Sequence, residues 1–192
     1  MYPIVRLLKD AALASRQSPL APLDTHVSRH RCWPWDIDIW MELNNGRTLT
    51  LYDIGRTMLT LRTGLATVLK REKWAVAVAG TSIRYRRRIK AFETFEMKSR
   101  AIGWDDRFIY VEQGMWKANG ECANHALLRT VVTDSAGIVP PVRVIQAWGA
   151  KIDSPKLPDW VLAWCAAEDK RPWPPMHEAP QSPEDVTLAS AS

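Results

Sequence analysis

The densest group of polar side chains in the 192-residue sequence spans residues 36–45 and reads Asp-Ile-Asp-Ile-Trp-Met-Glu-Leu-Asn-Asn. Its three carboxylates and two amides stand where an expected strand gives way to an expected helix. The free N–H groups and the positive dipole end of a helix start can polarise a carbonyl oxygen. A carboxylate beside a polarised carbonyl is suited to hydrolysis. Loops and helix caps use the same residue types, and composition alone favours that plainer interpretation.

Hydrophobic spacing and turn residues predict the elements that must position this group. An amphipathic helix begins at Ile4, and a long helix runs from about Gly46 to Thr63, with Asn44 or Asn45 as N-cap and Gly64 closing it. Five strand-like segments span about 25–33, 74–89, 95–101, 107–117 and 121–133, and short helices span about 142–148 and 158–168. The last four strands are joined by connections too short for parallel crossovers, so the sheet is expected to be antiparallel. Gly80 is expected to mark a bulge or bend in the second strand.

The chain is expected to form one domain with extensions at both ends. We divide it into an N-terminal helix and linker (1–24), a central domain (25–150), and a C-terminal helix with a Pro-rich tail (151–192) that is expected to be mobile from about Arg171. With 46% hydrophobic and 24% charged residues, the composition excludes a wholly disordered chain. A net charge of +5 favours an anionic ligand without indicating nucleic acid.

Several motifs, in this order, resemble the hotdog-fold thioesterases related to 4-hydroxybenzoyl-CoA thioesterase. They are Asp36-Ile37-Asp38, Asn44-Asn45-Gly46-Arg47 and Asp53-Ile54-Gly55-Arg56. Gly103-Trp104-Asp105-Asp106 with Tyr110-Val111-Glu112 is similar to the thioesterase superfamily member 6-like branch. The resemblance covers roughly residues 25–148.

The resemblance implies an α+β hotdog fold: an antiparallel five-stranded sheet wrapped around a long central helix, here with extra terminal helices. It also implies a homodimer or a dimer of dimers with sheets joined edge to edge, and acyl-CoA sites at the subunit interface. The expected activity is an acyl-CoA thioesterase in which Asp38 acts as nucleophile or base and a helix N-terminus holds the oxyanion. We therefore expect Asp38, Glu42 and Asn45 to be catalytic and Asn44 to contact the substrate.

Two departures from the branch keep an alternative open. The motif histidine is replaced by Glu42 and the motif tyrosine by Thr48. Glu42 could serve as a general base, or its charge could repel the anionic ligand and leave a non-catalytic acyl-CoA binding protein. A dehydratase on the same fold is disfavoured, because no suitably placed histidine accompanies the helix.

The arginine-rich run at residues 84–88 has two interpretations. As a strand it would place Arg84, Arg86 and Arg88 on one face, either as a solvated edge or as a seat for the phosphates of coenzyme A. Nucleic acid is disfavoured, because the run lacks interleaved aromatic residues. Tyr52 and Met58 could line an acyl tunnel, although helix core is the favoured role.

No metal site or cofactor is expected, because the histidines and cysteines lack ligand spacing. Three cysteines without a close pair favour a reducing compartment, and we expect a cytoplasmic protein. The longest apolar run has six residues, too few to cross a bilayer. For the N-terminal helix, packing on its own domain or on a dimer partner is favoured over contact with a membrane surface.

Overall fold

The computed structural model describes residues 2–175, and the chain divides into two compact units, residues 1–156 and 157–192. The larger unit contains α1 (Ile4–Ala14), β1 (His26–Arg31), the 3₁₀ turn η1 (Pro34–Asp36), α2 (Asn45–Arg62), α3 (Leu65–Glu72), β2 (Ala75–Tyr85), β3 (Thr94–Trp104), β4 (Ile109–Lys117), β5 (Cys122–Asp134), β6 (Gly137–Val139) and α4 (Pro141–Trp148). The second unit contains α5 (Asp159–Asp169). Most of the tail predicted to be mobile, residues 176–192, lies outside the described residues.

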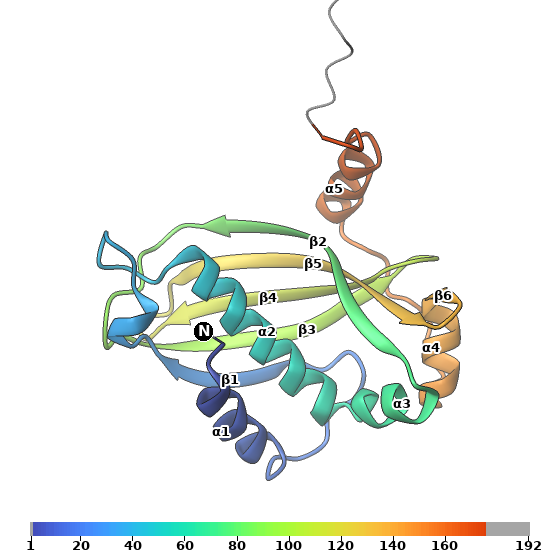
Figure 1. Ribbon diagram of the computed structural model, residues 1–192, viewed down its shortest axis with the longest axis horizontal. Helices are drawn as coiled ribbons and strands as arrows, with labels where there is room; N and C mark the ends of the chain where they lie inside the picture. Colours follow the sequence, from blue (N-terminus) through green and yellow to red (C-terminus); the bar gives the residue numbers. More distant parts are fainter. Residues whose placement is uncertain (1, 176–192) are drawn as a thin grey trace, which may run out of the picture. The chain divides into compact units, whose positions relative to one another are not determined.

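The strands of the larger unit form one antiparallel sheet in the order β1-β3-β4-β5-β2, with β6 paired to β5 (Figure 1). The expected bulge in β2 is confirmed by a register shift between Val78 and Gly80. One strand more than predicted is found within residues 2–175, because a tight turn after β5 returns the chain. In that turn Asp134 accepts the backbone N–H of Ala136 at 2.8 Å.

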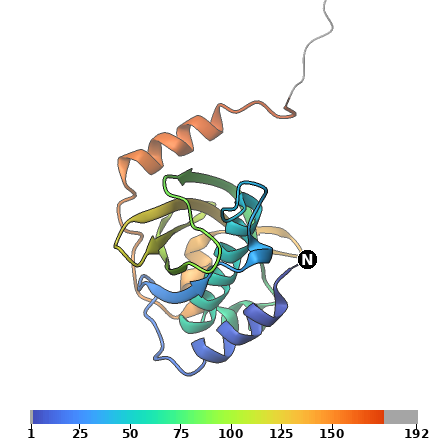
Figure 2. The ribbon, with the colours of Figure 1, turned by 90° about the vertical axis from the view of Figure 1, so that its left-hand side faces the viewer.

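Helix α2 lies across one face of the sheet, and Figure 2 shows the sheet arching over it. The expected cap is confirmed: Asn44 Oδ1 accepts the N–H of Arg47 at 3.1 Å. Gly64, with a φ of 75°, follows the end of the helix as predicted. At Gly55 the helix approaches the sheet so closely that a Cβ would lie 2.7 Å from Met97 Cε. Glycine is therefore needed there for the helix to reach the core.

Helix α3 is absent from the sequence prediction. Gly64 ends α2 and also begins α3, so the helix breaker separates two helices and does not lead directly into a strand. The buried Val68 joins α3 to a small cluster with Trp74, Val132 and Val144. This cluster closes the end of the larger unit opposite the start of α2.

Helix α1 packs on its own domain through polar as well as apolar contacts. Ala14 belongs to the main core, and the buried Asp10 lies 3.6 Å from His30 Nδ1. Burial lowers the pKa of His30 to about 3 and that of His26 to about 4, so both imidazoles are neutral near pH 7. Among the helices of residues 2–175, none combines the length and apolar character needed to cross a bilayer.

Candidate functional site

A cavity of about 420 Å³ opens at the start of α2, and we call it the helix-start cavity. Its wall is formed by Tyr2, Trp35, Asp36, Ile37, Asn44, Gly46, Arg47 and Thr50. The residues come from the segment before α1, from η1 and the hairpin after it, and from the N-cap and first turns of α2. The structure therefore brings a carboxylate, two aromatic rings and a helix N-terminus to one place.

The backbone N–H groups of Asn45 and Gly46 have no hydrogen-bond acceptor among residues 2–175. The next two N–H groups of α2 are satisfied, because that of Arg47 donates to Asn44 Oδ1 and that of Thr48 donates to the Asn44 carbonyl. Gly46 lies in the cavity wall, and a Cβ at this position would stand 3.2 Å from Asn44 Oδ1. Two unpaired donors at a positive helix end are suited to an oxygen that carries developing negative charge.

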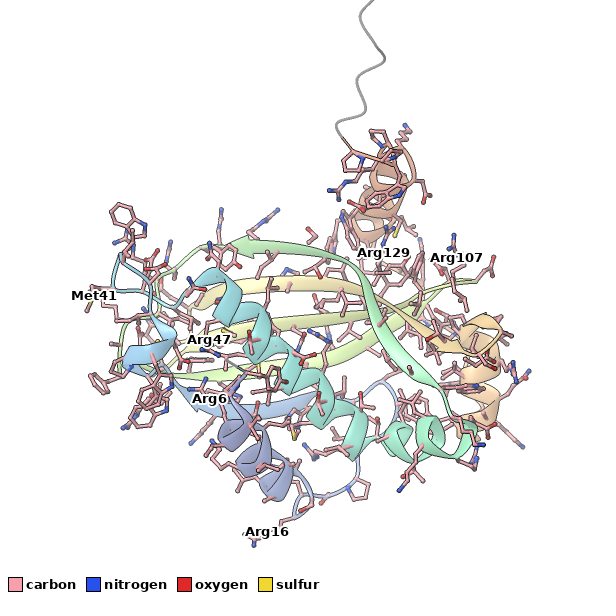
Figure 3. All side chains as sticks on the ribbon, viewed as in Figure 1. Arg6, Arg16, Met41, Arg47, Arg107 and Arg129 are labelled. Carbon is pink, nitrogen blue, oxygen red and sulfur yellow. The ribbon has the colours of Figure 1, made fainter. Side chains whose placement is uncertain are left out.

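The carboxylate in the cavity wall belongs to Asp36, whose side chain is fully buried. Asp36 Oδ2 accepts Arg6 Nη2 at 2.7 Å and the backbone N–H of Trp33 at 3.0 Å, and Oδ1 lies 3.2 Å from Arg47 Nε. Its carbonyl accepts the N–H of Asn44 at 2.9 Å. Figure 3 shows Arg6 and Arg47 approaching this region from α1 and α2. Asp36 is thus held in place by both guanidinium groups and fixes the residue that caps α2.

Asp38 lies in a short hairpin next to this cavity and does not line it. Ile37 bridges to Leu43, and the N–H of Asp38 donates to the carbonyl of Glu42 at 2.9 Å. Asp38 Oδ1 accepts the backbone N–H of Trp40 at 2.8 Å, while Oδ2 has no hydrogen-bond partner within the described chain. The sequence placed Asp38 against the helix start. In the structure Asp36 lines the helix-start cavity, and Asp38 lies in the adjacent hairpin, two residues further along the chain.

Glu42 is half-buried, and its Oε2 lies 2.8 Å from Arg88 Nε. The predicted alternation of Arg84, Arg86 and Arg88 along a strand is wrong, because β2 ends at Tyr85. After Tyr85 the backbone leaves the regular strand pattern, because the N–H groups of Arg86 and Arg87 both donate to the Ala123 carbonyl. Of the three predicted anion-binding arginines, Arg88 instead neutralises Glu42.

Tyr52, predicted to contact substrate, is completely buried in the core. Its hydroxyl donates to the side chain of Asn124, and burial raises its pKa. It lines neither the helix-start cavity nor the apolar cavity described next. Met58 is also buried in the main core, as the favoured interpretation of the sequence expected.

A second cavity, of about 320 Å³, lies along the later half of α2, and we call it the apolar cavity. Most of its wall is aliphatic or aromatic, with Leu59, Leu69, Val76, Val78, Ala101 and Trp104 among the contributors. Asp53 lines this cavity, and Tyr2 lines the helix-start cavity. The Tyr2 hydroxyl donates to Asp53 Oδ2 at 2.7 Å, and burial and this carboxylate raise the pKa of Tyr2 to about 12. This hydrogen bond separates the two cavities along one face of α2.

The sequence prediction lacks three residues at this site: Tyr2 and Arg47, which line the helix-start cavity, and Arg6, which binds Asp36. Arg47 stands in the Asn-Asn-Gly-Arg motif, so it could have been found. Tyr2 and Arg6 lie more than 25 residues before the hairpin, and no local spacing indicates that α1 returns there. No cluster of His, Cys, Asp or Glu able to hold a metal ion is found within residues 2–175.

Comparison with known proteins assigns the chain to a family. The model of the thioesterase-like superfamily matches residues 32–165, which include the hairpin, α2 and the whole sheet except β1. The chain belongs to the thioesterase-like superfamily. It is 32% identical over 139 residues to Protein THEM6 of Xenopus laevis, covering 71% of this chain and 65% of that protein. The chain spans between about half and two thirds of the length of the curated relatives it matches.

Solved structures of the superfamily confirm the hotdog fold. YbaW from Escherichia coli, described as a probable thioesterase, superposes with a TM-score of 0.59 at 15% identity, covering 63% of this chain and 94% of that one. The protein smu.793 from Streptococcus mutans, solved bound to acetyl CoA, gives a TM-score of 0.50 at 14% identity, covering 61% and 86%. At these identities the likeness shows the fold alone.

Proposed function

We propose that this member of the thioesterase-like superfamily is a cytoplasmic acyl-CoA thioesterase that binds its substrate at the start of α2. The observation that carries the proposal is the pair of unpaired N–H groups, of Asn45 and Gly46, at a cavity that adjoins the Asp38 hairpin. The smu.793 protein binds acetyl CoA on the same fold, which supports a CoA thioester as ligand.

In the proposed reaction the thioester carbonyl oxygen accepts hydrogen bonds from Asn45 and Gly46. Asp38 removes a proton from water as the water oxygen attacks the carbonyl carbon. The C–O bond forms and the electron pair of the C=O bond moves to the oxygen at the helix start. When the C–S bond breaks, the leaving thiolate takes the proton from Asp38, and the products are a carboxylic acid and free CoA thiol.

The surroundings of the two carboxylates support Asp38 as the base. Both oxygens of Asp36 lie close to guanidinium groups, Oδ2 2.7 Å from Arg6 Nη2 and Oδ1 3.2 Å from Arg47 Nε, so this carboxylate is committed to two buried ion pairs. Asp38 has one oxygen without a partner within residues 2–175. We therefore assign Asp36 as a positioning residue, which fixes the helix start through the N–H of Asn44.

The apolar cavity is proposed to take the acyl chain. It lies along the same face of α2 as the helix-start cavity, and the hydrogen bond between Tyr2 and Asp53 stands between them. Replacing Ala101 in its wall with leucine would fill part of the volume. The acyl-CoA with the highest kcat/KM should then become shorter, whereas Ala118→Leu, on the exposed turn after β4, should leave the preference unchanged.

The polar end of the substrate is proposed to lie near Arg84 and Arg86, which form no ion pair within the described chain. The Glu42 charge is offset by Arg88, so it does not create an isolated negative charge near the anionic ligand.

Dimerisation is proposed through β2, which is an edge strand with five consecutive exposed residues from Ala75 to Ala79.

The test is steady-state hydrolysis of short, long and aromatic acyl-CoAs by wild type, Asp38→Asn and Asp106→Asn. Loss of a general base lowers kcat by about 10²–10⁴. Asp106, an exposed residue far from the helix start, serves as the matched control and should keep full activity. Unchanged turnover in Asp38→Asn would reject the assigned base.

The replacement of the motif histidine by Glu42 favours a second candidate, a non-catalytic acyl-CoA binding protein. Isothermal titration calorimetry with the same acyl-CoAs separates the two candidates. Binding without turnover across the whole panel would support the binding protein, and absence of both would reject the site.

A further inference from the structure

Five large apolar side chains are exposed together at the end of the sheet where α2 begins. Trp35 lies in η1, Ile39, Trp40 and Met41 lie between η1 and α2, and Phe92 lies on the β2–β3 connection. Their exposed fractions range from 59% to 85%. We call this group the apolar tip, and Figure 3 marks it by Met41. Because soluble proteins rarely expose a large contiguous apolar patch, this group indicates an interaction surface.

The fold holds the apolar tip outward. Glu42 bridges to Lys90, which joins the hairpin that carries Trp40 and Met41 to the connection that carries Phe92. Met41 and Phe92 both adopt positive φ angles, 60° and 63°, which are costly for large side chains. The exposure is therefore built into an ordered backbone.

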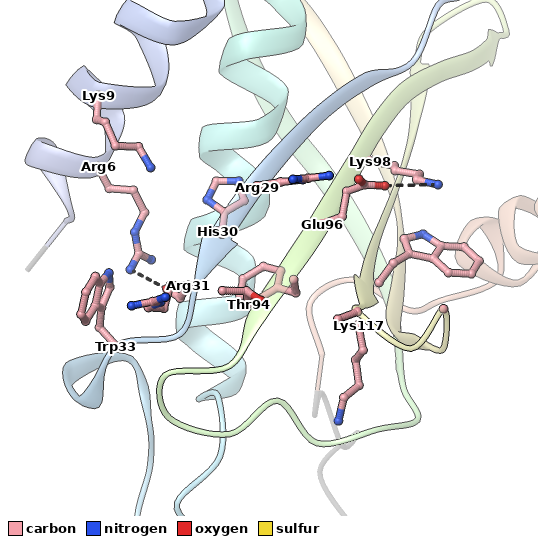
Figure 4. A pocket seen from close by; sticks show the side chains of 14 residues that line it. Arg6, Lys9, Arg29, His30, Arg31, Trp33, Thr94, Glu96, Lys98 and Lys117 are labelled. Atoms are coloured by element: carbon pink, nitrogen blue, oxygen red, sulfur yellow. Dashed lines mark hydrogen bonds and ion pairs between the residues drawn. The ribbon is translucent and has the colours of Figure 1, made fainter.

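A basic cavity of about 920 Å³ adjoins the apolar tip, and Figure 4 shows its side chains. Six of the lining residues are cationic: Arg6, Lys9, Arg29, Arg31, Lys98 and Lys117. Three of them pair with carboxylates outside the cavity wall, Arg6 with Asp36, Lys9 with Asp10 and Lys117 with Glu93, whereas Arg29 and Arg31 have no ion pair within the described chain. The one acid among the lining residues, Glu96, lies 3.5 Å from Lys98 Nζ. Arg6 Nη1 has no hydrogen-bond partner within the described chain, although only 9% of its side chain is exposed. A buried, unsatisfied guanidinium nitrogen in a cationic cavity fits a phosphate oxygen.

Trp33 makes the apolar tip and the basic cavity one surface. Trp33 lines the basic cavity, stacks on Trp35 with ring centroids 5.4 Å apart, and meets Phe92 edge to face at 6.2 Å. Arg31 lies over the same ring at 5.6 Å. Exposed aromatic and aliphatic side chains beside clustered arginines and lysines are typical of proteins that lie in the interface of an anionic membrane.

We propose that this surface docks on an anionic phospholipid bilayer, with the apolar tip inserted among the headgroups and the basic cavity holding lipid phosphates. A second copy of the chain fits this surface poorly, because it would bring the same cationic cavity against itself. The free edge of β2 also offers copies a different surface. The membrane surface is distinct from the exposed face of α1, which carries Val5 and Leu8.

The experiment is co-sedimentation of the full chain with large unilamellar vesicles of phosphatidylcholine, with and without phosphatidylglycerol. Wild type should bind the vesicles that contain phosphatidylglycerol, and high salt should weaken this binding. Two double variants, Trp40→Ser with Met41→Ser and Arg29→Glu with Arg31→Glu, should each lower the partition coefficient by about tenfold or more. The matched control is Arg107→Glu, at the opposite end of the sheet in Figure 3, which should bind as wild type does.

Further outcomes would overturn the proposal. Absence of vesicle binding by wild type would reject the proposal. Binding of both double variants that equals binding of wild type would also reject it. If Val5→Ser with Leu8→Ser removes binding while the apolar tip variants keep it, the membrane contact belongs to α1. If the apolar tip variants change the mass measured by light scattering and wild type does not bind vesicles, the surface is an interface between copies. Because no substrate is present, the result does not depend on the proposed hydrolysis.

Discussion

Asp36→Asn tests the assignment of Asp36 as the residue that holds the helix start. An asparagine keeps one oxygen and places an NH₂ group against the donors of Arg6 or Arg47. Hydrogen bonds to charged groups contribute about 1.5–3 kcal/mol each, and breaking a buried ion pair costs about 3–5 kcal/mol. Both guanidinium groups are largely buried, with 9% and 19% of their side chains exposed, so we expect the free energy of unfolding to fall by about 3–5 kcal/mol.

Urea and thermal denaturation measure this loss. For a domain of this size, about 1 kcal/mol shifts Tm by about 2–4 °C, so Tm should fall by about 6–20 °C. A double-mutant cycle with Arg6→Met isolates the pair and should give a coupling of about 1–3 kcal/mol. Asp106→Asn is the surface control and should change stability by less than about 0.5 kcal/mol.

A loss below about 1 kcal/mol in Asp36→Asn would refute the reasoning, because a solvated carboxylate gives that result. Activity provides a second measurement. The ion pairs of the Asp36 side chain hold the backbone whose carbonyl accepts the N–H of Asn44, so loss of these pairs should displace the helix start and lower kcat more than it raises KM. If stability falls while kcat is unchanged, Asp36 supports the fold without positioning the oxyanion donors.

Three further predictions concern pH, the helix start and the sheet edge. The pKa of His30 is held at about 3, below its ordinary value of about 6.5, so the unfolded chain takes up the proton first as pH falls. The contribution of His30 to the free energy of unfolding should be constant above about pH 6.5 and fall below that pH by up to about 1.4 kcal/mol per pH unit. Urea denaturation of His30→Gln should therefore show a shallower decline with falling pH than that of wild type. Gly46→Ala places a Cβ 3.2 Å from Asn44 Oδ1, so kcat for acyl-CoA hydrolysis should fall by about tenfold or more while KM changes little, and wild-type kcat would contradict the oxyanion assignment. Ala77→Asp with Ala79→Asp places like charges along the free edge of β2, so light scattering should report a monomer where wild type is a dimer; a variant that stays dimeric would place the interface elsewhere.

Much of the fold could be predicted because its signals are local. The N-cap of α2, Gly64 after its end and the bulge at Gly80 in β2 each depend on a few neighbouring residues. The end of β2 could not be found this way, because Tyr85 ends the strand where the backbone turns toward the Ala123 carbonyl. That interaction joins residues far apart in the sequence, and the arginine run offers no local stop signal.

The site was predicted in part for the same reason. The sequence correctly indicated that Asn44 or Asn45 caps the long helix, and the structure shows that Asn44 does, since the cap is set within four residues. The sequence did not indicate that Arg6 reaches Asp36 across 30 residues, because that contact depends on how α1 docks. The pattern of residue types therefore located the start of the helix and its cap, and missed Tyr2 and Arg47 in the wall of the helix-start cavity.

Asp36 and Asp38 show why spacing alone could not assign the roles. Two residues apart, they are equivalent in the sequence, and either could serve as a base. Their surroundings separate them: Asp36 is buried between two guanidinium groups, whereas Asp38 keeps one oxygen without a partner in the described chain. A carboxylate held in two buried ion pairs at a helix start serves the fold, whereas a carboxylate with an unpaired oxygen in a hairpin contributes little to stability. The difference originates in the N-terminal helix, because Arg6 on α1 pairs with Asp36, and this contact is the reason for proposing Asp38 rather than Asp36 as the base.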